Sequence, residues 1–207
     1  GKTSKKPVRD VFKFHYKELL IAIACYLTVT VPFYTFSVFV IGFLRKFKNF
    51  SMDQALFMSC VVMFIFMLIV PISGFISDKI GRKKVMLTAA VGMLVLIYPA
   101  FWLLANSDNN MIFALTGQII IASLVAIYGA PMPAFLVDLF PTKIRYTGIG
   151  LSYNIAAAIF GGTVPLVATW LIDKSGNLTA PAFYIVITSL VTLYALKFYK
   201  DPIKKAS

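Results

Sequence analysis

The clearest potential for chemistry in this sequence lies in a short charged stretch between two long apolar runs. Residues 74–84 hold one carboxylate, Asp78, among four Lys and Arg side chains, with glycine at positions 74 and 81. A carboxylate at such a turn can accept backbone N–H hydrogen bonds where the next helix begins. Glycine permits the close approach or the positive φ that a tight turn requires. The stretch therefore predicts a tight helix–turn–helix whose chemistry is ion pairing and hydrogen bonding.

A second charged stretch, residues 138–145, places Asp138 and Arg145 on either side of Pro141. We expect the two side chains to pair across the proline turn and to fix how the flanking apolar runs meet. An exposed pair of this kind is worth under about 1 kcal/mol. A purely structural role and a gating role are equally open for it.

Residue sets typical of enzymes are missing from the apolar runs. The sequence has no H-E-x-x-H motif and no Cys/His metal spacing, and no nucleophile, base and orienting group occur together in the apolar runs. Its two cysteines, Cys25 and Cys60, lie within apolar runs and are interpreted as small buried side chains. We expect no enzymatic activity, no metal and no cofactor.

The elements that must position these stretches are membrane-spanning helices. The chain is 59% hydrophobic and 14% charged, with a mean hydropathy of +0.84. A span needs about 20 mostly apolar residues. Six stretches qualify: residues 19–43, 54–77, 85–105, 111–135, 147–171 and 181–199. The sequence predicts an all-α integral membrane protein, with a basic cytoplasmic linker (1–18), a six-helix transmembrane domain (19–199) and a cytoplasmic tail (200–207).

Basic residues are distributed unevenly between the two sides that this topology creates. Of 20 Lys and Arg residues, 16 fall in the termini and alternate connections on one side, and 4 fall on the other. The positive-inside rule therefore predicts that both termini are cytoplasmic. The basic residues at span ends suit anionic lipid headgroups, and their distribution argues against nucleic-acid binding despite a net charge of +12.

The first stretch resembles the G-x-x-x-D-[RK]-x-G-R-[RK] signature of the major facilitator superfamily, matched from Gly74 to Lys83. Residues 138–145 resemble the superfamily's [DE]-x-x-P-x-x-x-R element. Residues 33–36, 146–148, 151–154 and 158–162 look like the metabolite:proton symporter branch, whose members carry proline and betaine, 2-oxoglutarate, citrate or shikimate. The resemblance implies one half of a twelve-span unit, built from inverted three-helix repeats. It also implies a bacterial inner-membrane location and, as partners, an N-terminal six-helix half, the bilayer, a small substrate and protons. A conformational gate is expected at Gly74, Asp78, Lys79, Gly81, Arg82, Asp138 and Arg145.

Substrate contacts are expected from uncharged polar side chains, because the spans carry no Asp, Glu, His, Lys or Arg away from their ends. The resemblance places the first and fourth spans along a central cavity, with the second and fifth beside it. The candidates are Tyr34, Tyr128, Tyr153 and Asn154; for each, hydrogen bonding between helices is an equally good interpretation. A coupled proton would need a carrier in the other half or at the membrane edge, such as Glu18.

Two functions follow from these observations. The first is one half of a secondary active transporter that moves a small polar metabolite with a proton by alternating access. The alternative is a non-transporting membrane scaffold, or a fragment of a split transporter. Small residues four apart in the fifth span, such as Gly148 and Ser152, further predict that this span packs closely against another helix.

Overall fold

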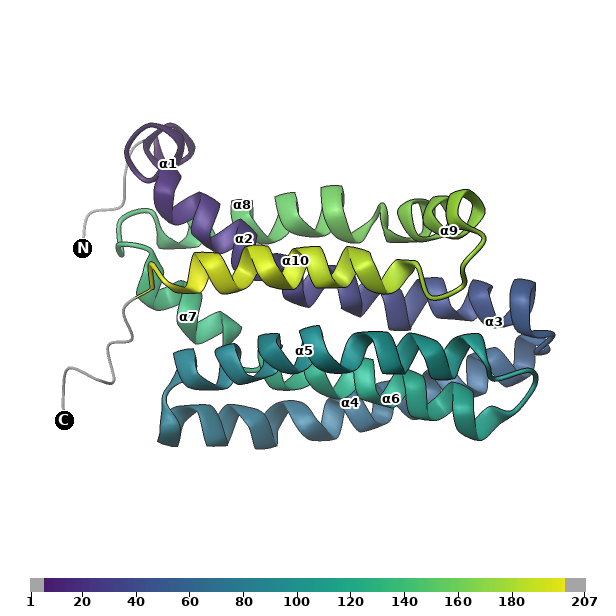
Figure 1. The fold of residues 1–207 in the computed structure, drawn as a ribbon. Coiled ribbons are helices and arrows are strands. Elements are labelled where there is room, and N and C mark those ends of the chain that lie inside the picture. Colours follow the sequence, from purple (N-terminus) through teal and green to yellow (C-terminus); the bar gives the residue numbers. More distant parts are fainter. Residues whose placement is uncertain (1–5, 200–207) are drawn as a thin grey trace.

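The computed structural model describes residues 6–199, and all regular elements in that range are helices. A short helix α1 (Pro7–Phe14) precedes six long helical rods that run back and forth as a bundle (Figure 1). The rods are α2 (Tyr16–Tyr34) continuing through η1 (Thr35–Phe39) and α3 (Val40–Lys48); α4 (Met52–Ile80); α5 (Arg82–Ala105); α6 (Met111–Gly129) with α7 (Met132–Leu139); α8 (Arg145–Ile155) with η2 (Ala156–Gly161) and α9 (Val164–Ser175); and α10 (Pro181–Leu196).

Each predicted span falls on one rod. Five of the rods, between 24 and 33 residues long, are long and apolar enough to cross a membrane, and α10 is a shorter apolar helix. Helix α10 ends at Leu196, three residues before the predicted end of the sixth span. In lipid, each rod satisfies its backbone N–H and C=O groups internally, which is why long apolar runs give helices here. The chain is a multi-pass membrane protein.

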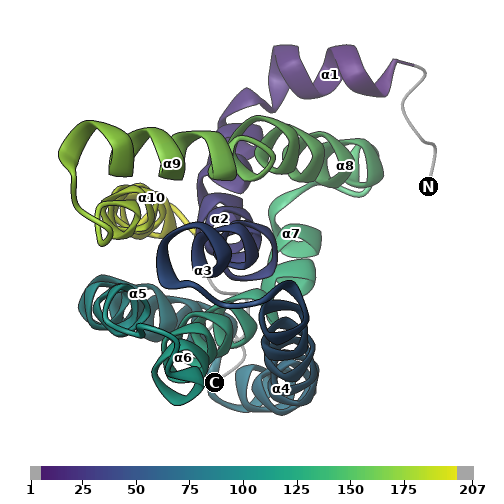
Figure 2. The same cartoon turned by 90° about the vertical axis from the view of Figure 1, so that its right-hand side faces the viewer.

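The first rod lies in the centre of the bundle, as the view along the rods shows (Figure 2). Helix α10 packs against both α2 and α5, and α6 packs against α4 and α5. The buried set Gly148, Ser152 and Ala156 of the fifth rod faces inward, and α8 and η2 contact α2. The close packing predicted for that rod is therefore confirmed.

The described chain begins and ends at the same end of the bundle (Figure 1). That end also holds the turn at Gly81 and the turn at residues 140–144, and we call it the basic end. The alternate connections thus lie together, as the predicted topology requires. Which side of the membrane the basic end faces stays a prediction.

The turn at the basic end between α4 and α5 consists of Gly81 alone. Its φ of +100° is a positive φ that glycine adopts without steric cost. Gly74, by contrast, lies inside α4, and a side-chain carbon built on it would meet nothing within 4 Å. Among residues 6–199, no side-chain hydrogen bond caps the start of α5, so the expected capping by Asp78 is wrong.

Two rods contain a π-helical turn near their middle, which the sequence did not predict. In η2, the Gly162 N–H donates to the Ala157 carbonyl at 2.7 Å, five residues back. Pro165 follows and has no N–H to offer the Gly161 carbonyl, which favours a wider turn at this point. Hydroxyls satisfy carbonyls around both π segments: Thr35 donates to Val31 at 2.8 Å and Thr163 to Ile159 at 2.6 Å.

Candidate functional site

A cavity of about 300 Å³ opens near the middle of the bundle. Four rods line it, namely the first, second, fourth and fifth, which are the spans that the resemblance places at and beside a central cavity. Its lining consists of Val29, Thr30, Phe33, Tyr34, Phe66, Val70, Val125, Gly129, Tyr153 and Ala157. Aromatic rings and hydroxyls are the polar features of this wall, and none of these lining residues carries a charge.

Tyr34 lies where the first rod passes from α2 into η1, and its ring packs on the backbone of η2. A side-chain carbon built on Gly161 would lie 2.8 Å from Cδ2 and 2.9 Å from Cε2 of the Tyr34 ring. Only glycine leaves room for the ring at this distance. The last residue of α2 thus meets η2 at the cavity wall, with the Tyr34 ring lying against Gly161.

Tyr153 contributes a second ring to the same wall from α8. Its ring centroid lies 5.4 Å from that of Tyr26 in an edge-to-face arrangement, and 48% of Tyr153 is exposed. Edge-to-face pairs of this kind hold ring orientation as well as contributing apolar contact. Tyr153 is therefore a positioned ring in the cavity wall.

The other two candidate contacts lie elsewhere. Tyr128 is fully buried between α6 and α2, where its hydroxyl donates to the Cys25 carbonyl at 3.0 Å. The Asn154 amide donates to the Gly150 carbonyl of its own helix at 2.7 Å, and the side chain is not part of the cavity lining. Of the four candidates, the structure brings Tyr34 and Tyr153 together at one cavity.

Phe66 and Phe33 complete the aromatic wall, and neither was among the candidate substrate contacts. Their ring centroids are 5.8 Å apart. Phe66 belongs to α4, which is apolar on all sides, so nothing in the residue type marks the face that reaches the cavity. Only the assignment of the second span as a flanking helix could have drawn attention to it.

A polar cluster at the basic end joins the two charged stretches. An Arg82 guanidinium nitrogen donates to Asp138, and the Tyr199 hydroxyl donates to the same carboxylate oxygen at 3.1 Å. Lys83 donates to the Tyr199 backbone carbonyl at 2.6 Å. The cluster ties the start of α5 to the end of α7 and to the chain after α10.

The predicted pair between Asp138 and Arg145 is wrong. Arg145 Nε donates instead to the Phe140 carbonyl at 3.1 Å, which stabilises the turn before α8. Asp138 pairs with Arg82, 56 residues away in the sequence, because α5 begins and α7 ends at the same level of the bundle. The two motifs are therefore parts of one structural unit.

Asp78 and Lys79 lie on the exposed surface at the end of α4. Lys79 Nζ lies 4.2 Å from the centroid of the Phe75 ring, a cation–π contact on the helix surface. Asp78 is one turn after Gly74, so the open space at Gly74 and the Asp78 carboxylate lie on the same side of α4. Among residues 6–199, no atom fills the space beside Gly74 on this side of α4.

Comparison with known proteins identifies the family. The model of the Major Facilitator Superfamily matches residues 16–207. The chain belongs to this superfamily. The resemblance seen in the two motifs is thereby confirmed.

Relatives in the superfamily are named as transporters of proline, betaine or ectoine. The chain is 29% identical over 197 residues to the glycine betaine/proline/ectoine/pipecolic acid transporter OusA of Dickeya dadantii, covering 95% of this chain and 39% of that protein. It is 30% identical over 197 residues to the ectoine/proline transporter ProP of Corynebacterium glutamicum, with 94% and 38% covered. It is 28% identical over 189 residues to the proline/betaine transporter of Escherichia coli, with 91% and 37% covered. The chain thus spans about two fifths of the length of these relatives.

Proposed function

We propose that the chain is the C-terminal six-helix half of a secondary active transporter that carries a small zwitterionic metabolite, such as proline or a betaine, by alternating access. The observation that carries the proposal is the cavity lined by Tyr34, Tyr153, Phe33 and Phe66 near the middle of the bundle. A substrate bound there would be about equally far from both ends of the rods, as alternating access requires. An N-terminal six-helix half would close the open side of the cavity.

The lining favours a zwitterion over a di- or tricarboxylate. Aromatic faces attract an ammonium group by cation–π interaction, worth about 0.5–2 kcal/mol depending on desolvation. An organic acid with two or three carboxylates would require cationic partners, and this wall offers aromatic and hydroxyl groups instead. The carboxylate of a zwitterion can accept hydrogen bonds from the tyrosine hydroxyls. The names of the relatives, which include proline, betaine and ectoine, support the same substrate class.

Proton coupling is the second part of the proposal. The spans of this half carry no Asp, Glu, His, Lys or Arg near the cavity, so the proton carrier belongs to the other half or to the membrane edge. Glu18 is the edge candidate on this chain. Its carboxylate lies 3.4 Å from His15 Nδ1 and beside a hollow of about 330 Å³ that Asp138 and Tyr199 also line.

The basic end is proposed to face the cytoplasm of a bacterial inner membrane, with the exposed side of α4 as part of a gate. In the state closed to the cytoplasm, Asp78 would accept hydrogen bonds from the N-terminus of a helix of the other half, packed over Gly74. The Arg82–Asp138 pair would hold the α4–α5 turn in the position that this contact needs.

Uptake measurements on the chain together with its N-terminal half test the substrate site. We expect uptake of labelled proline or glycine betaine and none of 2-oxoglutarate or citrate. Replacing Tyr34 by Leu removes the ring and should raise KM about 5- to 30-fold, whereas Tyr34→Phe keeps the ring and should have a smaller effect. Tyr146→Leu is the matched control, since Tyr146 is 93% exposed on the same rod as Tyr153. Uptake of organic acids alone would refute the substrate class, and no uptake of any compound would favour the scaffold alternative.

The gate is tested by Asp78→Asn in the same protein. Loss of the charge should destabilise the state closed to the cytoplasm by about 1–2 kcal/mol, roughly a 5- to 30-fold shift in population. A cysteine placed at Tyr153 should then react faster with a thiol reagent from the cytoplasm. An unchanged labelling rate in a variant that inserts normally would show that Asp78 only balances the basic turn.

A further inference from the structure

Helix α1 lies crosswise to the rods, at the edge of the bundle beside the basic end, while the rods run parallel to one another (Figures 1 and 2). The chain turns at His15, whose φ of −128° and ψ of 28° interrupt the helix before α2 begins at Tyr16. In a membrane crossed by the rods, α1 therefore lies parallel to the bilayer plane at the level of the basic end. The linker predicted for residues 1–18 thus contains an ordered helix.

The faces of α1 differ sharply in chemistry. Val11 is its one fully buried residue among those described, and it packs in the cluster that holds Phe140 and Ile144. At about 100° per residue, Val8 and Phe12 follow Val11 on one side of the helix, and Arg9 and Lys13 form the opposite face. Val8 and Phe12 are 51% and 53% exposed. An apolar strip thus lies beside the protein contact and a basic strip faces away.

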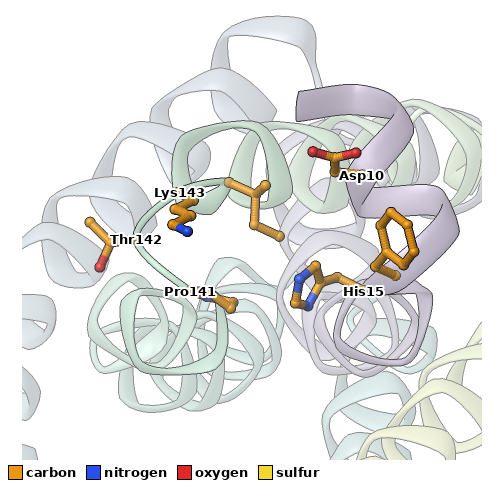
Figure 3. A pocket seen from close by; sticks show the side chains of 7 residues that line it. Asp10, His15, Pro141, Thr142 and Lys143 are labelled. Atoms are coloured by element: carbon orange, nitrogen blue, oxygen red, sulfur yellow. The ribbon is translucent and has the colours of Figure 1, made fainter. Parts of the chain in front are cut away.

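The described protein leaves apolar side chains exposed on both sides of Val11. A hollow of about 540 Å³ separates Asp10, Phe14 and His15 from the turn at residues 141–144 (Figure 3). Phe14 lies on the opposite side of Val11 from Val8 and Phe12, and it is 64% exposed. A helix of eight residues is marginal in water without an apolar partner. The exposed rings need an apolar environment that the described bundle does not supply.

We propose that α1 is an interfacial anchor that binds the surface of a membrane containing acidic phospholipids. Its in-plane orientation puts Val8 and Phe12 at the level of the acyl-chain boundary, while Arg9 and Lys13 reach the phosphate groups. Short helices with an apolar aromatic face and a Lys/Arg face bind this interface in this way. Charge complementarity selects acidic over zwitterionic lipids, because each basic side chain near the surface strengthens binding to an anionic membrane. The anchor holds the start of the first rod, and it depends on membrane insertion rather than on transport or substrate.

Fluorescence quenching by brominated lipids tests the anchor in the whole chain reconstituted in nanodiscs. Trp102 and Trp170 are replaced by Phe, and Phe12→Trp makes position 12 the single fluorophore. We expect strong quenching by brominated lipid and preferential quenching by brominated phosphatidylglycerol over brominated phosphatidylcholine. The relative binding constant should favour phosphatidylglycerol several-fold, with about 30-fold as the ceiling for two basic side chains. Arg9→Gln with Lys13→Gln should bring this ratio close to one.

A single-tryptophan variant that retains Trp102 is the matched control. Trp102 lies near the opposite end of the bundle and is half exposed. Its quenching by the two lipids should not respond to the Arg9 and Lys13 changes. The proposal is overturned if the tryptophan at position 12 is quenched by neither lipid, which would indicate water or a covering protein. A lipid ratio that does not respond to loss of the two basic side chains overturns it as well.

Discussion

Replacing Gly161 by Ala tests the contact on which the shape of the cavity depends. The added methyl group would lie 2.8 and 2.9 Å from two carbons of the Tyr34 ring, where ordinary contacts are 3.4–4 Å. Overpacking of a filled core costs about 1–3 kcal/mol. Here the cavity on the other side of the ring offers room, so we expect the low end of that range, about 1 kcal/mol.

The displaced ring has one direction open to it, into the cavity of about 300 Å³. The variant should therefore lose affinity more than stability. If the ring must be pushed back before substrate enters, a cost of about 1 kcal/mol corresponds to a KM about fivefold higher. The maximum rate per folded transporter should change little.

The assay combines uptake kinetics with thermal unfolding, followed by reaction of the buried Cys25 thiol in a Cys60→Ser background. Gly150→Ala is the matched control, because a methyl group there meets nothing within 4 Å on the same rod. Helix propensity predicts that this control is neutral or stabilising by up to about 1 kcal/mol. Combining Gly161→Ala with Tyr34→Leu should give a coupling energy of about 1 kcal/mol, since the second change removes the clash. The reasoning is refuted if Gly161→Ala behaves like Gly150→Ala in both measurements.

Three further outcomes are expected. Asp138→Asn should destabilise the fold by about 1 kcal/mol, because it weakens a partly exposed pair with Arg82 and the hydrogen bond from Tyr199. In the same thermal unfolding assay, Arg145→Gln should have a smaller effect. Equal effects of the two changes would contradict the observed pairing. Tyr128→Phe should also cost about 1 kcal/mol by removing a buried hydrogen bond, with KM unchanged; a raised KM would show that Tyr128 reaches the substrate. Cysteines at Lys83 and Lys174 should react with an impermeant reagent from opposite sides of the membrane, and labelling of both from one side would disprove the topology.

Sequence reasoning recovered the rods because an apolar run in lipid has to satisfy its own backbone. It did not identify α1, although Val8, Val11 and Phe12 have helical spacing. The intervening basic residues made the segment look like a polar linker. No residue type identifies the π segments in the sequence. Only Pro165 and the hydroxyls of Thr35 and Thr163 indicate that the backbone hydrogen bonding of the helix is interrupted there.

The spacing of residues along the sequence could not identify hydrogen-bond and ion-pair partners that lie on different rods. Arg145 is seven residues from Asp138 and seemed the natural partner, but the arrangement of the rods brings Arg82 to that carboxylate. In the sequence, Tyr34 and Tyr128 both lie within apolar runs, and nothing distinguishes their roles. The structure separates them, because one lines the cavity and the other is enclosed against Cys25. A helix that is apolar all round gives no signal for the face that points inward.

Each π segment contains one residue more than the α-helical turn it replaces. Losing that residue would rotate everything beyond it by about 100° around the rod axis. In the first rod, such a rotation would move Phe43, which is 1% exposed, to the exposed place of Gly42, and would bring the exposed Arg45 to the buried place of Leu44. A one-residue gap at positions 35–39 or 156–161 in an alignment with a relative would therefore record a change in which side chains face the interior. Alignments that forbid gaps inside transmembrane helices would compare inward-facing residues of one protein with lipid-facing residues of the other.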